Sequence, residues 1–365
     1  MIGIAGAGFS GAVIARELAE RGHQVTVFET RDHVAGNCHT LRDPSTRVMV
    51  HRYGPHIFHT DNEQVWRYMC RFADMVPYTH RAKAVAGGQV WSLPVNLHTI
   101  NQVYGTAMGP AEAEAFLARR VIPCDQPRSF RDAALAQVGP DLYYLLFDGY
   151  TRKQWGIDPA ELPASVFHRL PVRFTYDDNY FNHPWQGIPR DGYTAAVTKI
   201  LDHKQITVHL GTPFPKGERF DHVVWTGPLD EWFDHDEGRL AYRTLDFHME
   251  IHSGDYQGAP IINYPDAVVP WTRITEHKHF VGWERHDHSV IYREYPRDAE
   301  PGDVPFYPVR LVDDLEVLRR YTARAEALED VTFAGRLGTY RYLDMDRTIA
   351  EAFTAAEQVA VKVAA

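Results

Sequence analysis

Cysteine is scarce in this sequence, and so are long runs of apolar residues. The 365 residues include three cysteines, Cys38, Cys70 and Cys124. An odd number without close spacing makes neither a disulfide framework nor a zinc knuckle. No stretch approaches about 18 uninterrupted apolar residues, and a strand that begins at Ile2 leaves no room for a signal peptide. We therefore expect a reduced, cytoplasmic protein without membrane insertion.

Positive charge is also in short supply. Lysine and arginine total 38 against 48 aspartates and glutamates, which gives a formal net charge of −10, and no basic run occurs. This balance argues against nucleic acid or an anionic membrane surface as the main partner, so any bound anion must be held locally. With 44% hydrophobic residues, a chain of this length can bury a sizeable core in two or three modules.

The first thirty residues predict a βαβ unit. The apolar run 2–5 predicts a strand, a helical pattern follows at 12–21, and a second strand covers 24–28. Gly22 suits the left-handed position just past the helix end. A glycine-rich turn therefore stands between the first strand and the helix, which is where dinucleotides bind in such units.

Each residue of that turn has a physical role. Gly6 permits the tight turn, Gly8 lets the backbone approach a pyrophosphate, and Gly11 lets the helix pack closely on the strand. Glu29, at the end of the second strand, can accept hydrogen bonds from a ribose. We predict cofactor contacts at Gly6, Gly8, Phe9, Ser10, Gly11 and Glu29.

Features further along the chain favour FAD over NAD. The segment 31–37 follows the second strand directly and is basic and glycine-containing, as flavoproteins commonly have at the FAD pyrophosphate. Near the end of the chain, a strand at 331–334 leads through Gly335 and Gly338 to a helix from about Asp346. The positive end of that helix would stabilise the N1/C2=O edge of a reduced flavin. A further strand at 221–225 runs into the same crevice.

The middle of the chain has two different patterns. Residues 97–170 are rich in helical pattern, whereas 232–310 show short alternating stretches typical of antiparallel strands. We predict an α/β fold, with the ligand cleft where its parts meet. Its parts are an FAD-binding Rossmann-like (doubly wound) domain at 1–75, 191–231 and 320–365, a helical insertion domain at 96–170, and an antiparallel β-sheet domain at 76–95, 171–190 and 232–319.

Four ordered motifs give the chain a specific resemblance. They are the turn 6–11, Tyr53–His59, Lys153–Gly156 and Arg336–Asp346. In these motifs, and nearly end to end, the chain resembles bacterial UDP-galactopyranose mutases. The resemblance implies interconversion of UDP-galactopyranose and UDP-galactofuranose, or of a close nucleotide-hexose relative, without net redox change. Reduced FAD attacks the anomeric carbon through N5, the diphosphate leaves, and the flavin-bound sugar opens and recloses before the diphosphate returns.

The same resemblance implies partners and motion. The flavin must first be reduced, with NAD(P)H as the external reductant. Bacterial relatives suggest a homodimer, and the helical insertion is expected to contain a mobile lid that closes over the nucleotide sugar.

A departing diphosphate needs fixed positive charge, and guanidinium groups match phosphate oxygens best. Arg169 and Arg273 match the family's pyrophosphate-binding arginines, and with His56 they are the predicted catalytic residues. His56 lies in the Gly-Pro-His loop that resembles the segment covering the flavin, where it would orient the ring. We expect the charge of Arg169 to be needed for turnover and not for binding FAD.

The remaining site residues are carried over from the family's motifs. Tyr150 is expected to stack on the base, Gln154 to hydrogen-bond it, and Trp155 to border the sugar. Phosphate contacts are expected from Tyr180, Tyr307 and Tyr342, further substrate contacts from Phe181, Asn263 and His80, and further cofactor contacts from Asn37, His56, Arg336, Tyr342, Asp344 and Met345.

Histidines 51, 56 and 59 raise the alternative of a metal site. No cysteine or carboxylate cluster accompanies them, and the resemblance gives the region a flavin role, so we predict no metal.

Five positions depart from the family pattern. They are Ala35, Arg52, His80, Leu146 and His168. Ala35 concerns the bend of the pyrophosphate loop, whereas the others lie close to the sugar or base in the family. A few altered polar contacts shift discrimination by roughly 1–3 kcal/mol, so the exact hexose and base stay open.

Two other functions remain as alternatives. An oxidase or dehydrogenase of the amine-oxidase type would share the FAD half of the chain, but an amine needs no diphosphate clamp. A non-catalytic FAD- or nucleotide-binding module would bind UDP tightly without turnover.

Overall fold

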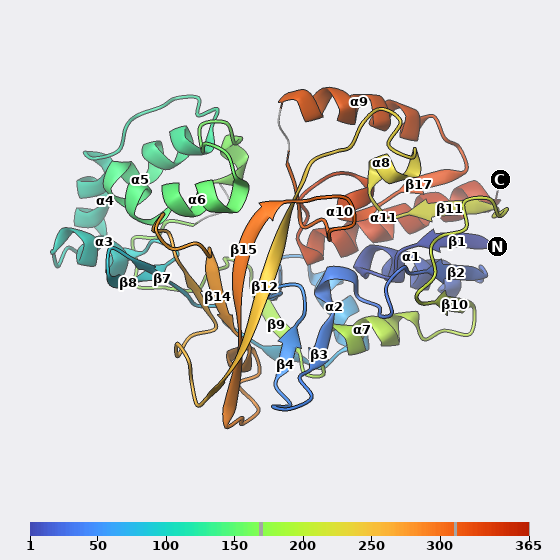
Figure 1. Ribbon diagram of the computed structural model, residues 1–365, viewed down its shortest axis with the longest axis horizontal. Helices are drawn as coiled ribbons and strands as arrows, with labels where there is room; N and C mark the ends of the chain where they lie inside the picture. The colour runs from blue at the N-terminus through green and yellow to red at the C-terminus, as the bar shows by residue number, and fades with distance from the viewer. Residues whose placement is uncertain (168–170, 310–311, 365) are drawn as a thin grey trace.

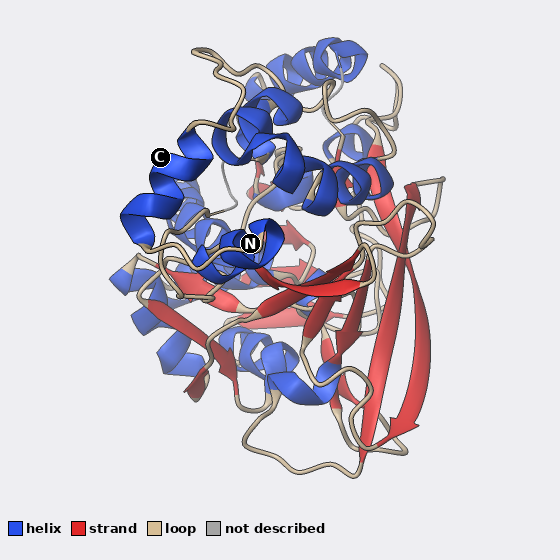
Figure 2. Cartoon of the chain, turned by 90° about the vertical axis from the view of Figure 1, so that its left-hand side faces the viewer, coloured by secondary structure: helices blue, strands red, loops and turns tan. Residues whose placement is uncertain are grey.

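The computed structural model describes residues 1–167, 171–309 and 312–364, without the side chains of 312–314. It confirms the predicted α/β fold (Figure 1). Helices lie on either side of the strands when the molecule is turned by 90° (Figure 2). Within the described ranges, no helix is long and apolar enough to cross a bilayer.

A five-stranded parallel sheet forms the half of the molecule that was predicted to bind the dinucleotide. The predicted strands at the two ends of the chain meet here, together with strands from its middle. The sheet order is β10–β2–β1–β11–β17, made of β1 (Ile2–Ala5), β2 (Val25–Phe28), β10 (Ile206–His209), β11 (His222–Trp225) and β17 (Val331–Phe333).

Helices cover this sheet. On one face α1 (Phe9–Glu20) packs against α7 (Gly192–Leu201) and α11 (Met345–Ala364), and the buried Val13, Val197 and Ile349 share one core. Gly22 has a φ of +98°, the left-handed conformation predicted after α1. The other helices of this half are α2 (Glu63–Phe72), α8 (Leu229–Trp232), α9 (Val312–Glu326) and α10 (Gly335–Gly338).

The second large sheet has seven strands in the order β16–β12–β15–β14–β13–β7–β8. One pairing differs from the predicted antiparallel sheet, because β13 and β7 run parallel, with Asn263 opposite Ala84. A long excursion of chain separates these two strands, so no tight turn forces them to run in opposite directions. The strands are β7 (Ala82–Ala86), β8 (Gln89–Leu93), β12 (Tyr242–Ser253), β13 (Ile261–Asn263), β14 (Arg273–Glu276), β15 (His288–Asp298) and β16 (Tyr307–Pro308).

The predicted helical region packs on one part of this mixed sheet. A shared core includes Trp91, Leu142 and Phe167. Gly139, with a φ of +74°, and Pro140 interrupt the regular geometry of the longest of its helices. The helices are α3 (Leu97–Tyr104), α4 (Pro110–Ala118), α5 (Phe130–Leu146) and α6 (Asp148–Trp155).

Short elements connect the two halves. Strand β9 falls in a segment expected to belong to the large antiparallel sheet, but it pairs instead with β5 and β6 in a separate three-stranded sheet. These elements are β3 (Thr40–Arg42) with β4 (Met49–His51), β5 (Phe58–Thr60), β6 (Met75–Pro77) and β9 (Trp185–Pro189), and the short 3-10 turns η1 (Gly36–Cys38), η2 (Ala164–Val166) and η3 (His277–Phe280).

Candidate functional site

A cavity of about 1930 Å³ lies between the parallel sheet, the mixed sheet and α6. It brings together residues from nearly every part of the chain. Gly11 does not line it, and Arg169 lies outside the described residues. The predicted site residues that line the cavity are Gly6, Gly8, Phe9, Ser10, Glu29, Asn37, His56, His80, Tyr150, Gln154, Trp155, Tyr180, Phe181, Asn263, Arg273, Tyr307, Arg336, Tyr342, Asp344 and Met345.

The glycines of the first turn shape the floor of the cavity. Gly6 has a φ of +98°, and a Cβ there would lie 2.2 Å from Thr226 Oγ1. A Cβ on Gly11 would lie 2.0 Å from the Gly6 carbonyl oxygen, so Gly11 serves the close packing of α1 rather than contact with a ligand. Across the turn, a Cβ on Gly36 would lie 3.3 Å from Gly8 Cα. The two backbones form a cradle without side chains, which fits a pyrophosphate.

Arg31 adds a cation to this cradle, beside the predicted Glu29. The Glu29 carboxylate accepts the backbone N–H groups of Ala7, at 2.8 Å, and Arg31, at 3.0 Å. The Arg31 guanidinium donates to Asn37 Oδ1 at 2.9 Å and stacks 4.6 Å from the centre of the Tyr53 ring. Its Nη1 is buried without a partner among the described residues. In the sequence Arg31 is only one residue of a basic segment, whereas its geometry in the structure suits a bound anion.

His56 is held over the cavity by a second histidine. The His56 backbone N–H donates to His51 Nδ1 at 3.0 Å, and the His56 ring nitrogen Nδ1 lies 2.9 Å from the Gly54 carbonyl oxygen, to which it donates. Burial lowers the pKa of His56 to about 4 and that of His51 well below its usual value. Both rings are therefore neutral near pH 7. His59 Nδ1 lies 2.7 Å from His183 Nδ1. Each of the three histidines that raised the alternative of a metal site, at positions 51, 56 and 59, thus has a protein partner at its Nδ1 atom.

Arg273 belongs to a row of polar residues across the mixed sheet. The strand register places it between Asn263 on β13 and Glu294 on β15. Arg273 Nη2 donates to Glu294 Oε2 at 2.5 Å, and Thr275 Oγ1 donates to Glu294 Oε1 at 2.9 Å. Glu294 is fully buried. The carboxylate thus orients the Arg273 guanidinium, and the remaining N–H groups of the guanidinium stay available to an anion in the cavity. Glu294 was not predicted, because strand register rather than sequence proximity pairs it with Arg273.

Aromatic rings form a continuous wall between α6 and the far end of the chain. The ring centres of Trp155 and Tyr307 are 6.0 Å apart, and those of Tyr307 and Tyr342 are 5.6 Å apart and stacked. The Arg336 guanidinium lies 5.1 Å from the centre of the Tyr342 ring. Tyr150 lines the same cavity, and burial raises its pKa. These rings offer flat surfaces and hydroxyls to a base and a diphosphate.

A loop holds Tyr180 and Phe181 against the predicted specificity position His80. Tyr180 N donates to the His80 carbonyl oxygen at 2.8 Å, and the Phe181 ring stacks on His59 with ring centres 3.7 Å apart. The Arg173 guanidinium donates to backbone carbonyls of this loop, including that of Phe181 at 3.3 Å. His80 is 3% exposed, and its Nδ1 has no partner among the described residues.

The departures from the family pattern lie in different places. Ala35 and His80 line the cavity, and Ala35 adopts a φ of +74°. Arg52 is exposed and Leu146 is packed in the helical core, so neither reaches the cavity as expected. Side-chain direction explains both cases, because the chain neighbours Tyr53 and Phe147 point into the cavity instead. His168 lies outside the described residues.

One other group of potential metal ligands occurs in the described ranges. Asp255, Glu276 and His279 each place one ligand atom within 4.8 Å of the others. Glu276 already accepts the backbone N–H of Tyr256 at 2.8 Å, and Lys278 pairs with Asp255. A metal ion would have to displace these partners, so we propose none there.

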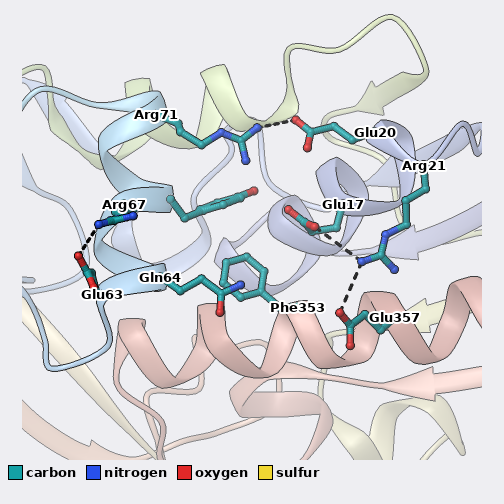
Figure 3. A pocket seen from close by; sticks show the side chains of 10 residues that line it. Glu17, Glu20, Arg21, Glu63, Gln64, Arg67, Arg71, Phe353 and Glu357 are labelled. Atoms are coloured by element: carbon teal, nitrogen blue, oxygen red, sulfur yellow. Dashed lines mark hydrogen bonds and ion pairs between the residues drawn. The ribbon is translucent and has the colours of Figure 1, made fainter.

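Figure 3 shows a second cleft, of about 540 Å³, among α1, α2 and α11. Its charged side chains pair with one another: Arg71 with Glu20 at 2.6 Å, and Arg67 with Glu63 at 2.6 Å. None of the described residues that line it was predicted as a site residue. Because these charges pair with each other, we assign this cleft no ligand.

Acid is expected to destabilise the fold through its buried histidines. Burial, reinforced by the charge of Arg273, lowers the pKa of His80 to about 3, and burial lowers the pKa of His277 to about 3. The unfolded chain therefore binds more protons than the folded one at any pH between these values and about 6.5. The free energy of unfolding should then fall by about 1.6 kcal/mol per ring from pH 6.5 to pH 5.

Urea unfolding at several pH values measures this effect. The variant His80→Asn should show a shallower decline than the wild type. The exposed His288 provides a control, since His288→Asn should leave the decline unchanged. Equal declines in the wild type and His80→Asn would show that His80 is not buried in its neutral form.

Family models and known proteins are similar to this chain over most of its length. Residues 145–342 match the family model of UDP-galactopyranose mutase, and residues 4–72 match that of an NAD(P)-binding Rossmann-like domain. A probable UDP-galactopyranose mutase of Klebsiella pneumoniae is 52% identical over 364 residues, covering 99% of this chain and 95% of that protein. A dTDP-fucopyranose mutase of Escherichia coli is 49% identical over 364 residues, covering 97% of each.

Solved structures share the fold at low sequence identity. A reduced UDP-galactopyranose mutase is 15% identical with a TM-score of 0.76, covering 99% of this chain and 93% of that one. A putrescine oxidase is 12% identical with a TM-score of 0.61, covering 99% and 98%. The oxidase likeness concerns the fold alone. The first two relatives, in contrast, are 52% and 49% identical over nearly the whole chain. On that basis the chain belongs to the UDP-galactopyranose mutase family.

Proposed function

We propose that this protein is an FAD-dependent mutase that interconverts the pyranose and furanose forms of a nucleotide-linked hexose. One observation carries the proposal. A single cavity joins the glycine cradle of a dinucleotide-binding unit to Arg273 and a wall of tyrosines. An amine substrate needs no guanidinium to bind it, whereas a sugar diphosphate does.

The residues of the cradle fit FAD. Gly8 and Gly36 leave room for a pyrophosphate, and Glu29 stands at the end of β2. Arg31 has a buried N–H donor that meets no acceptor in the described part of the chain. The N-terminus of α11, at Met345, lines the same cavity and offers its positive dipole end. Reduced FAD would supply a nucleophile, its N5 atom, for the anomeric carbon.

The protein's own part is to bind, orient and stabilise. Arg273, held by Glu294, would balance the charge of the diphosphate both as it leaves and as it returns. Arg169, outside the described residues, is proposed for the same task by family resemblance. Tyr307 and Tyr342 would donate hydroxyl hydrogen bonds to phosphate oxygens, and the neutral His56 would keep the cofactor ring in place.

We propose UDP-galactose as the sugar-nucleotide substrate. The two close relatives are named for different substrates, UDP-galactopyranose and dTDP-fucopyranose, at 52% and 49% identity. Fucose lacks the 6-hydroxyl of galactose. The buried Nδ1 of His80 lines the cavity and has no partner among the residues that the structure describes. It supports a substrate with the additional hydroxyl, because an unmet polar group costs about 1–3 kcal/mol.

The test is conversion by purified protein before and after reduction. The FAD-loaded protein would be reduced with dithionite, and the conversion of UDP-galactofuranose and dTDP-fucofuranose would be followed by HPLC. We expect conversion only by the reduced protein, with UDP-galactofuranose preferred. Bleaching of the flavin by NADPH without oxygen would support NAD(P)H as the reductant.

Other outcomes identify the alternatives. Oxygen consumption on adding an amine would favour an oxidase. Tight UDP binding by a reduced protein that converts no sugar nucleotide would favour a binding module. Preference for dTDP-fucofuranose would keep the mutase and overturn the assignment of the hexose.

A further inference from the structure

Helix α6, which carries Tyr150 and Gln154, is docked closely onto the loop at 264–271. In Figure 1, α6 lies beside the upper end of β15, next to this loop. A Cβ on Gly149 would lie 2.2 Å from the Pro265 carbonyl oxygen, so only glycine allows this approach. One turn later on the same helix face stands Lys153. Its side chain therefore enters the loop that Gly149 touches.

Lys153 is surrounded by backbone carbonyls. The Nζ atom lies 2.5–3.0 Å from the carbonyl oxygens of Tyr264, Asp266, Val269 and Trp271. The ammonium has three N–H donors and faces four carbonyl acceptors. The loop therefore binds it mainly as a compact positive charge, and not through one fixed donor–acceptor pairing. Burial lowers the pKa of Lys153 to about 8, while the converging carbonyl dipoles favour its charged form. Without the cation, four carbonyl oxygens would face one another.

Arg243 fixes the opposite side of the same helix. Its Nε donates to the Gln154 carbonyl oxygen at 3.0 Å, and its Nη2 donates to that of Lys153 at 3.2 Å. Arg243 is 4% exposed and lies on β12. A cation at the C-terminus of a helix is favourable, and here it ties the helix to the sheet. The C-terminal half of α6 is thus held between the 264–271 loop and β12.

The loop at 264–271 joins two strands that contribute to the cavity. Asn263 ends β13 and Arg273 begins β14. Holding α6 on this loop therefore sets the spacing between the proposed base contacts, Tyr150 and Gln154, and the proposed diphosphate contact, Arg273.

We propose that Lys153 is a positioning residue for nucleotide binding: its ammonium docks α6 on the 264–271 loop, so that the base and diphosphate contacts are held at the spacing of one nucleotide. This inference rests on the proposed function. It adds a role for a residue that does not line the cavity.

Binding of UDP to the oxidised, FAD-loaded protein tests the proposal. Isothermal titration calorimetry with Lys153→Met and Lys153→Ala should give a Kd between about tenfold and about a hundredfold higher than that of the wild type. The variant Gly149→Ala, which keeps the lysine, should show the same defect. In turnover by reduced protein, KM should rise in the same proportion while kcat changes less than about threefold.

Lys278→Met is the control for loss of a lysine that holds a loop. Lys278 Nζ donates to the Gly254 carbonyl oxygen at 2.7 Å, in the same part of the molecule and outside the cavity lining. We expect the wild-type Kd for UDP in this variant. Flavin content and circular dichroism of all variants report folding independently of binding.

Chemical rescue separates positioning from general weakening. Propylammonium replaces the atoms that Lys153→Ala removes, so it should restore UDP affinity in that variant and not in Lys153→Met, whose longer side chain occupies the space. Tetramethylammonium carries the same charge, but its methyl groups keep the nitrogen from coming as close as 2.5–3.0 Å to the carbonyl oxygens, so it should restore nothing.

Three results would overturn the proposal: unchanged UDP binding in both Lys153 variants, an equal loss in Lys278→Met, or no rescue of folded Lys153→Ala by propylammonium. Failure of the wild type to bind either UDP or dTDP would instead overturn the proposed function on which the inference rests.

Discussion

Replacing Arg273 by alanine is expected to lower kcat/KM by about a hundredfold to a thousandfold while FAD stays bound. The guanidinium lines the cavity on β14, and the cradle that fits FAD is built from β1, α1 and the segment after β2. We therefore expect the lost group to serve the diphosphate and not the cofactor. Initial rates with the dithionite-reduced variant, together with its flavin spectrum, measure both effects.

The ion pair complicates this experiment in a predictable way. Arg273→Ala leaves the buried Glu294 without its guanidinium partner, and breaking a buried pair destabilises a protein by about 3–5 kcal/mol. The double variant Arg273→Ala, Glu294→Gln removes the stranded charge. We expect it to recover stability and to remain as inactive as the single variant, which would show that the lost activity is not a consequence of unfolding.

Arg293 is the matched control for Arg273. It neighbours Glu294 on β15 and stacks on Trp271, with its guanidinium 5.3 Å from that ring centre, but it does not line the cavity. Arg293→Ala should therefore retain activity within a few-fold. Normal turnover by Arg273→Ala would contradict the assignment of this residue to the diphosphate.

Replacing Gly11 by alanine is expected to give a colourless protein. The added Cβ would lie 2.0 Å from the Gly6 carbonyl oxygen, a backbone atom that cannot move aside without moving the turn. Helix α1 must then shift from β1, and the backbone N–H groups at its N-terminus lose their place around the pyrophosphate. Flavin absorbance per protein should fall below about a tenth of the wild-type value, and activity should fall with it.

A substitution at Gly282 is the control that separates the effect of crowding from that of adding a methyl group to a glycine. No atom of the described residues lies within 4 Å of the position that a Cβ on Gly282 would take, and its φ is not in the left-handed region. Gly282→Ala should therefore bind FAD normally. Full flavin content in Gly11→Ala would mean that the packing of α1 on β1 does not determine cofactor binding.

Elements determined by neighbouring residues could be predicted from the sequence. The β1–α1–β2 unit depends on apolar runs and glycines within thirty residues, so its strands, its helix and the left-handed Gly22 follow from local chemistry. The glycine-rich turn and the resemblance to the family together named twenty of the residues that line the cavity. The turn and the four family motifs each consist of residues close together in the chain.

Pairings between distant segments were decided by the tertiary structure alone. The parallel pairing of β7 with β13, the contact of Arg273 with Glu294, and the carbonyl cage around Lys153 all depend on strand register or on how a loop closes. The expectation for Leu146 was wrong because the direction of a side chain at a helix end is set by the packing around it. A sequence pattern specifies which face of an element is apolar, whereas the competition among all packed elements selects the partner it meets.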